Sequence, residues 1–215
     1  EGSDPDAYRD TYDKQTNASA DDWAALLDLC NTLINTPDET FLAEVSQRAD
    51  IDQWLRHIAV DALAGNLEGG LTSGRGDDFA MYQGIADPRF LLVPHDLDTL
   101  LGEGDHSPDA DRSIFVYDGV DGLDRLLHHP DVVARYYAQY LDLIDTVFAP
   151  ETFDPLLDQA VGGWAPASVI QSMKDYLNDR IYGTGGILDQ IPQDGLTATS
   201  PLTEQDGYPH TTEDD

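Results

Sequence analysis

The sequence predicts a mainly α-helical domain with one small antiparallel β-hairpin, an α+β fold. Apolar residues recur every three or four positions over most of the chain, which is the period of a helix with one buried face. The period changes to that of strands between residues 78 and 94. Strands and helices do not alternate along the chain, so a parallel sheet is not expected.

Three helices are expected in the first third of the chain. The first ends before Pro37, the second is short, and the third begins at Asp50, whose spacing to Gln53 resembles a capping box. Gly65-Asn66 is a typical stop for the third helix. The residues expected on the buried faces are Trp23, Leu26, Leu27, Cys30, Leu33 and Ile34, then Phe41, Leu42 and Val45, and then Ile51, Trp54, Leu55, Ile58, Ala59, Ala62 and Leu63.

A hairpin and three longer helices are expected next. Strands at 78–83 and 89–94 are joined by a turn around 84–88, and the apolar run from Phe90 to Val93 is expected to be buried. Pro130 suits the first position of a long helix, and the histidine pair before it is expected to cap that helix. Two more helices are expected near 152–161 and 166–182. The apolar face of the long helix consists of Val132, Val133, Tyr136, Tyr140, Leu143, Ile144 and Val147.

One domain with two polar ends fits the 215 residues. Residues 1–18 are polar and turn-rich, residues 19–191 form the helical domain, and residues 192–215 are rich in Thr, Gly, Pro and acid, as in a linker or tail. Cys30 is the only cysteine, so a disulfide within the chain is excluded and a buried small side chain is expected. No apolar stretch approaches the roughly 20 residues of a membrane-spanning helix.

The charge is strongly one-sided, with 42 acidic against 11 basic residues and a formal net charge of −31. Nucleic acid is excluded as a partner, because its binders need clustered Lys and Arg to displace counterions. An excess of acid with only two lysines indicates adaptation to high salt, where surface repulsion is screened. An acidic calcium-binding surface and a merely soluble protein are the competing interpretations.

Carboxylates gather around the predicted hairpin. Glu68 lies in the loop before it, Asp78 at its start, and Asp96 and Asp98 directly after it. Hard cations such as Mg²⁺ take oxygen ligands, often one or two carboxylates with substrate phosphates. Solvated loop acids are the plainer interpretation in a chain this acidic. A second acidic loop lacks the glycine and closing glutamate of an EF-hand, although a looser calcium site stays open there; it contains Asp105, Asp109 and Asp111.

The order of these features resembles the CotH kinase family of atypical protein kinases, named for a spore-coat protein kinase. Family members read as a helix ending near G-N, an Asp, an N-Y-Y-L-Y strand, and P-W-D-x-D followed by Gly. The resemblance covers roughly residues 8–190. The matching residues are Tyr12, Lys14, Asn17, Asp22-Trp23, Gly65-Asn66, residues 79–82, residues 94–98, Gly102, Leu126-Leu127 and Arg180.

The resemblance implies the C-terminal, metal-binding lobe of a protein-kinase-like fold in an extracytoplasmic protein. ATP would be the phosphate donor, Mg²⁺ or Mn²⁺ the metal, and a Ser or Thr of a secreted or coat protein the acceptor. By position, Glu68 corresponds to the family's catalytic Asp and Asp96 to its metal-binding Asp. Asp98 would support Asp96, and Asp78, where the family usually has Asn, would be a second metal and nucleotide contact.

Three departures from the family pattern put turnover in doubt. Glu68 is one methylene longer than Asp, and misplacement by roughly an ångström can reduce a rate about 10²-fold. Asp78 adds negative charge against the triphosphate, and His95 replaces the family's Trp, which removes an apolar wall. The resemblance therefore leaves open a kinase lobe with weak or absent turnover and a non-catalytic extracellular module, either a pseudokinase or a calcium-stabilised binding domain.

The lysine that binds the nucleotide phosphates and the glycine-rich loop of a kinase are expected outside this sequence. Neither Lys14 nor Lys174 follows a strand and a glycine-rich turn, as a nucleotide-gripping lysine does. We therefore expect the N-terminal lobe to lie in a longer parent protein and the fragment alone to be inactive. The sequence leaves the oligomeric state and the acceptor protein undetermined.

Overall fold

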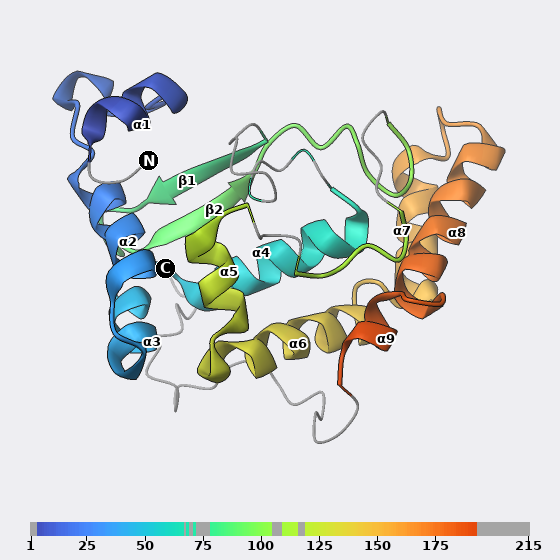
Figure 1. The fold of residues 1–215 in the computed structure, drawn as a ribbon. Helices are drawn as coiled ribbons and strands as arrows, with labels where there is room; N and C mark the ends of the chain where they lie inside the picture. The colour runs from blue at the N-terminus through green and yellow to red at the C-terminus, as the bar shows by residue number, and fades with distance from the viewer. Residues whose placement is uncertain are drawn as a thin grey trace.

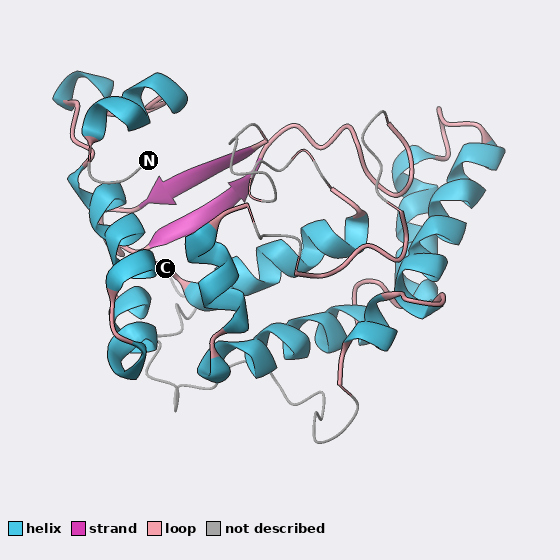
Figure 2. Ribbon diagram, in the orientation of Figure 1, coloured by secondary structure: helices cyan, strands magenta, loops and turns pink. Residues whose placement is uncertain are grey.

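The computed structural model describes residues 4–66, 68, 71, 78–104, 109–115 and 119–192 (Figure 1). This part of the chain consists mainly of helices, with a single two-stranded sheet packed against them (Figure 2), which confirms the mainly helical α+β class. The predicted tail from residue 193 onward and Asp105 lie outside the described residues. In chain order the elements are α1 (Pro5–Thr11), a 3₁₀ helix (Ala18–Ala20), α2 (Ala24–Asn35), α3 (Asp38–Ser46), α4 (Ile51–Ala64), β1 (Phe79–Gln83), β2 (Phe90–Pro94), α5 (Asp121–His128), α6 (Pro130–Asp145), α7 (Pro150–Val161), α8 (Ala167–Tyr182) and α9 (Ile187–Gln190).

The hairpin forms as predicted, with β1 antiparallel to β2 and Phe79 opposite Pro94. Phe90 and Leu92 are buried, but Val93 is 41% exposed, so the expectation that the whole apolar run is buried was wrong. Only one face of the sheet packs on the helices, and side chains along a strand alternate between its two faces. Apolar composition alone did not distinguish a two-faced buried strand from this one-faced strand.

Helix α4 is the central element, and it contacts β2, α6 and α8 (Figure 1). Asp50 caps its start by accepting a hydrogen bond from the Gln53 N–H at 3.2 Å. The Gln53 side chain does not complete the expected capping box, because its amide pairs with the main chain of β2. Its Nε2 donates to the Leu92 carbonyl at 2.8 Å, and its Oε1 accepts from the Leu92 N–H at 2.9 Å.

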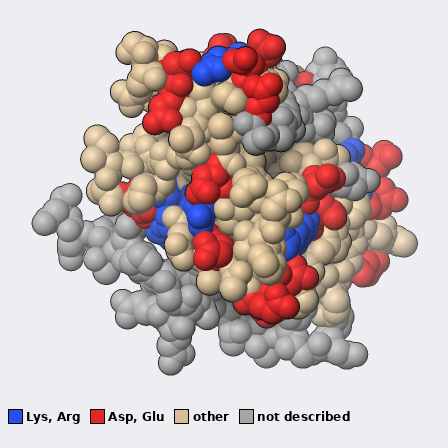
Figure 3. All heavy atoms as spheres, turned by 60° about the vertical axis from the view of Figure 1, so that its left-hand side comes forward, with Lys and Arg blue, Asp and Glu red and all other residues tan. Residues whose placement is uncertain are grey.

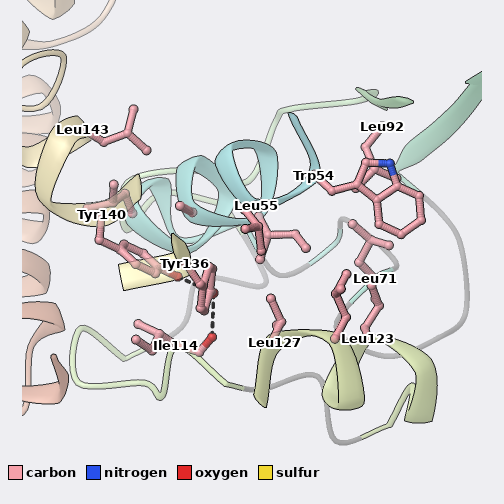
Figure 4. Packing of buried hydrophobic residues seen from close by; sticks show 14 of the residues in the cluster. Trp54, Leu55, Leu71, Leu92, Ile114, Leu123, Leu127, Tyr136, Tyr140 and Leu143 are labelled. Carbon is pink, nitrogen blue, oxygen red and sulfur yellow. Dashed lines mark hydrogen bonds between the residues drawn. The ribbon is translucent and has the colours of Figure 1, made fainter. Parts of the chain in front are cut away.

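The core extends from α4 to the helices and the strand packed on it, and where α4 meets α6 it contains two buried tyrosines (Figure 4). The Tyr136 hydroxyl donates to the Ile114 carbonyl at 2.8 Å and lies 2.5 Å from the Tyr140 hydroxyl. Burial raises the pKa of Tyr140, so its hydroxyl stays neutral. The predicted face of α6 is confirmed except at Val133, which is only half-buried and outside the core cluster, and at Val147, which lies beyond the helix and is 39% exposed. His129 caps α6 as expected, since its Nδ1 accepts from the Asp131 N–H at 3.2 Å.

The N-terminal region departs from the prediction in two ways. Residues expected to be turn-rich include α1, which Asp4 caps and Tyr8 anchors with a 4% exposed side chain. In α2 the buried stripe centres on Leu29, whereas Ile34 is 47% exposed and Cys30 is only half-buried. The predicted stripe is therefore rotated about the helix axis, since Leu33 is buried as expected but the core side includes Leu29 in place of Ile34.

Arg180 fastens α8 to two other parts of the chain and is only 2% exposed. Its Nε donates to the Ala62 carbonyl at 2.9 Å, near the end of α4. Its Nη1 donates to the carbonyls of Ala110 at 3.0 Å and Arg112 at 2.5 Å. One buried guanidinium therefore joins α8, the last turn of α4 and the segment at 109–115.

Acidic side chains are spread over the surface, and the Lys and Arg side chains visible on one face lie among them (Figure 3). Arg48 bridges Asp28 at 2.6 Å and Glu44 at 3.0 Å, and Arg125 bridges Asp38 at 2.6 Å. These two arginines are thus engaged in ion pairs with neighbouring acids. No described helix combines the length and the apolar character that crossing a membrane requires.

Candidate metal centre

The end of α4 begins the segment that leads to the candidate site. Gly65 ends the helix with φ +73°, a left-handed conformation that glycine adopts without a steric penalty. Asn66 follows and is 5% exposed. Its Oδ1 accepts a hydrogen bond from the Glu68 N–H at 3.1 Å, which fixes the main chain at Glu68.

Main-chain hydrogen bonds connect this loop to the residue before β1, and that residue to the one after β2. The Glu68 carbonyl accepts from the Asp78 N–H at 3.3 Å, and the Asp78 carbonyl accepts from the His95 N–H at 3.1 Å. The register of the hairpin, carried one residue beyond Phe79 and Pro94, sets Asp78 opposite His95. Three segments that are distant in sequence therefore meet at the open end of the hairpin.

Three side chains can share one cation at this place. One ligand atom from each of Asp78, His95 and Asp96 lies within 4.8 Å of the other two. Asp78 is half-buried, and His95 and Asp96 are exposed. Asp96 has φ +47°, a left-handed conformation that aspartate tolerates better than most residues. We call these three residues the candidate metal centre.

The structure thus brings together two of the four residues that sequence analysis assigned to the site. Asp78 and Asp96 are in the candidate metal centre, whereas Asp98, which is exposed, and Glu68, which is half-buried, are not in this group. Their roles stay predictions. Sequence analysis missed His95 as a candidate ligand and treated it only as the loss of an apolar wall. Its place opposite Asp78 depends on the register of the hairpin, which the predicted strands at 78–83 and 89–94 did not define.

Tyr176 of α8 packs against two glycine turns, one at Gly65 after α4 and one at Gly102 after β2. A Cβ atom at Gly65 would overlap the Tyr176 hydroxyl, and one at Gly102, which has φ +82°, would lie 2.9 Å from the Tyr176 ring. The intervening Leu101 N–H donates to the Ala64 carbonyl at 2.7 Å, so the chain after β2 returns to the end of α4. Burial raises the pKa of Tyr176, whose hydroxyl has no hydrogen-bond partner among the described residues.

The two lysines are engaged elsewhere. The Lys14 Nζ donates to the Asp22 carbonyl at 2.7 Å and lies 5.8 Å from the centre of the Trp23 ring. The Lys174 Nζ bridges Asp158 at 2.8 Å, beside a shallow pocket of about 200 Å³ between α7 and α8. No member of the candidate metal centre lines that pocket.

Comparison with known proteins agrees with a kinase-like class. A family model described as CotH kinase protein matches residues 1–179, and the chain belongs to this family. The inner spore coat protein H of Bacillus subtilis (strain 168) is 24% identical over 148 residues, which are 67% of this chain and 38% of that protein. The chain therefore spans well under half of this relative. No solved structure matches, so the kinase-like architecture of the lobe stays a prediction.

Proposed function

We propose that this chain is the metal-binding part of a CotH-type protein that transfers the γ-phosphate of ATP to a Ser or Thr of another protein. The observation that supports this function best is the convergence of Asp78, His95 and Asp96 at the end of the hairpin, with ligand atoms within 4.8 Å of one another. Two carboxylates and an imidazole suit a divalent cation. Family membership supports the reaction class.

Phosphoryl transfer relies mainly on positioning and charge stabilisation. A divalent metal, when bound, would neutralise charge on the phosphates. Asp96 and Asp78 would hold that metal, and Asp98 would support the segment after β2. Glu68, which the main chain ties to Asp78, would orient the acceptor hydroxyl. Because Glu replaces Asp at that position, we expect slow turnover.

We further propose that the acceptor is a coat or surface protein and that this protein acts outside the cytoplasm. The relative named above is an inner spore coat protein, and this is the observation that supports the location. The acidic surface is consistent with proteins as partners, since it repels nucleic acid and anionic lipid.

The acidic surface also supports a proposed adaptation to high salt. With a formal charge of −31, repulsion between surface carboxylates is screened over about 30 Å at 0.01 M salt and about 3 Å at 1 M. The thermal midpoint should therefore rise with KCl over this range. A midpoint that does not change would show that the acidity has another origin.

The second candidate function is a non-catalytic extracellular module, a pseudokinase or a calcium-stabilised binding domain. Two observations favour it. Both lysines of the chain are engaged away from the candidate metal centre. Glu68 is also absent from the group that can share a cation. Such a module would bind metal without transferring phosphate.

Calorimetric titration with Mg²⁺ and Mn²⁺ in high KCl tests the proposed site. We expect one specific site in the wild type, lost in Asp96→Asn and retained in Asp145→Asn. Asp145 is a suitable control because it is an exposed aspartate at the end of α6, outside the candidate metal centre. If both variants bind as the wild type does, Asp96 is not a ligand and the proposed site fails.

Phosphate transfer is then tested with labelled ATP and a Ser-rich coat-type protein, using the complete protein that contains this chain. Metal-dependent labelling that Asp96→Asn abolishes would support the kinase. Specific metal binding without labelling would favour the non-catalytic module, and a preference for Ca²⁺ would identify its calcium-stabilised form.

A further inference from the structure

We infer that the candidate metal centre prefers Mn²⁺ to Mg²⁺, because His95 adds an imidazole nitrogen to the two carboxylates. The inference rests on the proposed function, since it concerns the same site. His95 stands where the family pattern has Trp, and one of its ring nitrogens lies within 4.8 Å of ligand atoms of Asp78 and Asp96. The substitution thus supplies a metal ligand in addition to removing an apolar wall.

The hairpin register directs His95 toward Asp78. Residues directly opposite in an antiparallel pair project on the same face of the sheet. The hydrogen bond from the His95 N–H to the Asp78 carbonyl, at 3.1 Å, holds the two main chains in this pairing. The placement of the imidazole therefore follows from the main chain, which limits how far it can move from Asp78.

The conformation of Asp96 brings in the third ligand. Consecutive residues of a strand project on opposite faces, so an extended Asp96 would point away from His95. Its φ of +47° departs from the extended conformation directly after the strand. The carboxylate then lies within 4.8 Å of the ligand atoms of its neighbour and of Asp78.

The side chains of His95 and Asp96 are available to a cation. Within the described part of the chain, neither has an ion pair or a side-chain hydrogen bond. Arginines such as Arg48 and Arg125 form ion pairs with other acids. Both are exposed, so an ion can reach them and water can complete its coordination. An ion pair between a protonated imidazole and a carboxylate would compete with metal binding. Within the described residues, His95 forms no such ion pair.

The mixed ligand set distinguishes between the two metals. Mg²⁺ requires near-ideal octahedral geometry, loses water reluctantly and is bound chiefly by oxygen. Mn²⁺ also accepts carboxylate oxygens. As a first-row transition metal it binds mixed nitrogen and oxygen ligand sets, although more weakly than the later metals of that series. An imidazole in place of one water therefore benefits Mn²⁺ more than Mg²⁺.

The test compares Mn²⁺ with Mg²⁺ on wild type, His95→Asn and Asp96→Asn, by calorimetry of the chain in high KCl. We expect wild type to bind Mn²⁺ about tenfold or more tightly than Mg²⁺, and His95→Asn to lose most of that preference while it still binds Mg²⁺. Pulsed electron paramagnetic resonance of bound Mn²⁺ should detect a coupled ring nitrogen in wild type and none in His95→Asn. His95 is exposed, so this variant should unfold at the wild-type temperature.

The outcomes separate this inference from the proposed function. Equal Mn²⁺ to Mg²⁺ ratios in wild type and His95→Asn, or no coupled nitrogen in wild type, would overturn the role of His95 while the metal site stands. Unchanged metal binding in Asp96→Asn would instead overturn the site itself.

Discussion

The core between α4 and α6 and the candidate metal centre differ in almost every physical respect. Leu55 and Tyr140 are fully buried, and the tyrosine hydroxyl is hydrogen-bonded. His95 and Asp96 are exposed and lack side-chain partners in the described part of the chain. Helix α4 connects the two regions, since its body packs in the core and its end leads to the site (Figure 1). We therefore expect stability and the proposed metal binding to depend on different residues of the same framework.

The largest effect is expected in the core. Leu55→Ala should lower the free energy of unfolding by about 2–5 kcal/mol, because it removes buried methyl groups and leaves a cavity. Chemical denaturation measures the loss. The Mn²⁺ affinity of the folded variant should equal that of wild type, and a large loss of affinity would contradict the separation of the two regions.

A smaller effect is expected where α4 meets the hairpin. Gln53→Leu should lower the free energy of unfolding by about 1–3 kcal/mol, since it leaves the N–H and the carbonyl of Leu92 without partners. Gln47→Leu is the matched control, because that glutamine is exposed and only its Nε2 donates, to the Ala43 carbonyl at 3.3 Å. Equal losses in the two variants would show that the paired amide has no special role.

The next effect tests the turn behind the site. Gly102→Ala should cost about 1–2 kcal/mol for a left-handed alanine, and Tyr176 must also shift to admit the new methyl group. Metal affinity should fall as well, because this turn continues the segment that contains Asp96. The control is Gly163→Ala, where an added Cβ meets nothing within 4 Å. If Gly102→Ala is as stable as this control, the contact with Tyr176 is not a constraint.

The smallest effect depends on pH. Hydrogen bonding to Arg89 lowers the pKa of Asp87, so the pair stabilises the fold above the unfolded-state pKa and loses this contribution as pH falls through the folded-state pKa. Asp87→Asn should be less stable than wild type at pH 7 by less than about 1 kcal/mol, since the Asp87 side chain is 40% exposed. Urea unfolding at pH 7 and near pH 2 measures this, and a constant difference between the two proteins would exclude the ion pair as its cause.

The sequence predicted the longer helices and the hairpin because their apolar periods are regular, whereas the short α1 lies in a region expected to be turn-rich. The phase of α2 was wrong, because Leu29 faces the core and Ile34 does not, and the spacing of the apolar residues in this helix is compatible with either face. Asp78 and Asp96 could be assigned from their order along the chain. The role of Gln53 depends on which main-chain groups of β2 face α4, and the position of His95 depends on which residue it faces across the hairpin. A linear pattern does not contain this information.

The pairing of β2 with α4 also affects association between molecules. The residues of β2 whose main-chain nitrogens point away from β1 are Phe90, Leu92 and Pro94. Phe90 donates to the Arg48 carbonyl at 2.7 Å, Leu92 donates to Gln53, and proline has no N–H. An open strand edge is a template for β-aggregation. On this side the hairpin offers no free donor to a passing chain, so edge-to-edge growth through β2 is blocked without a third strand.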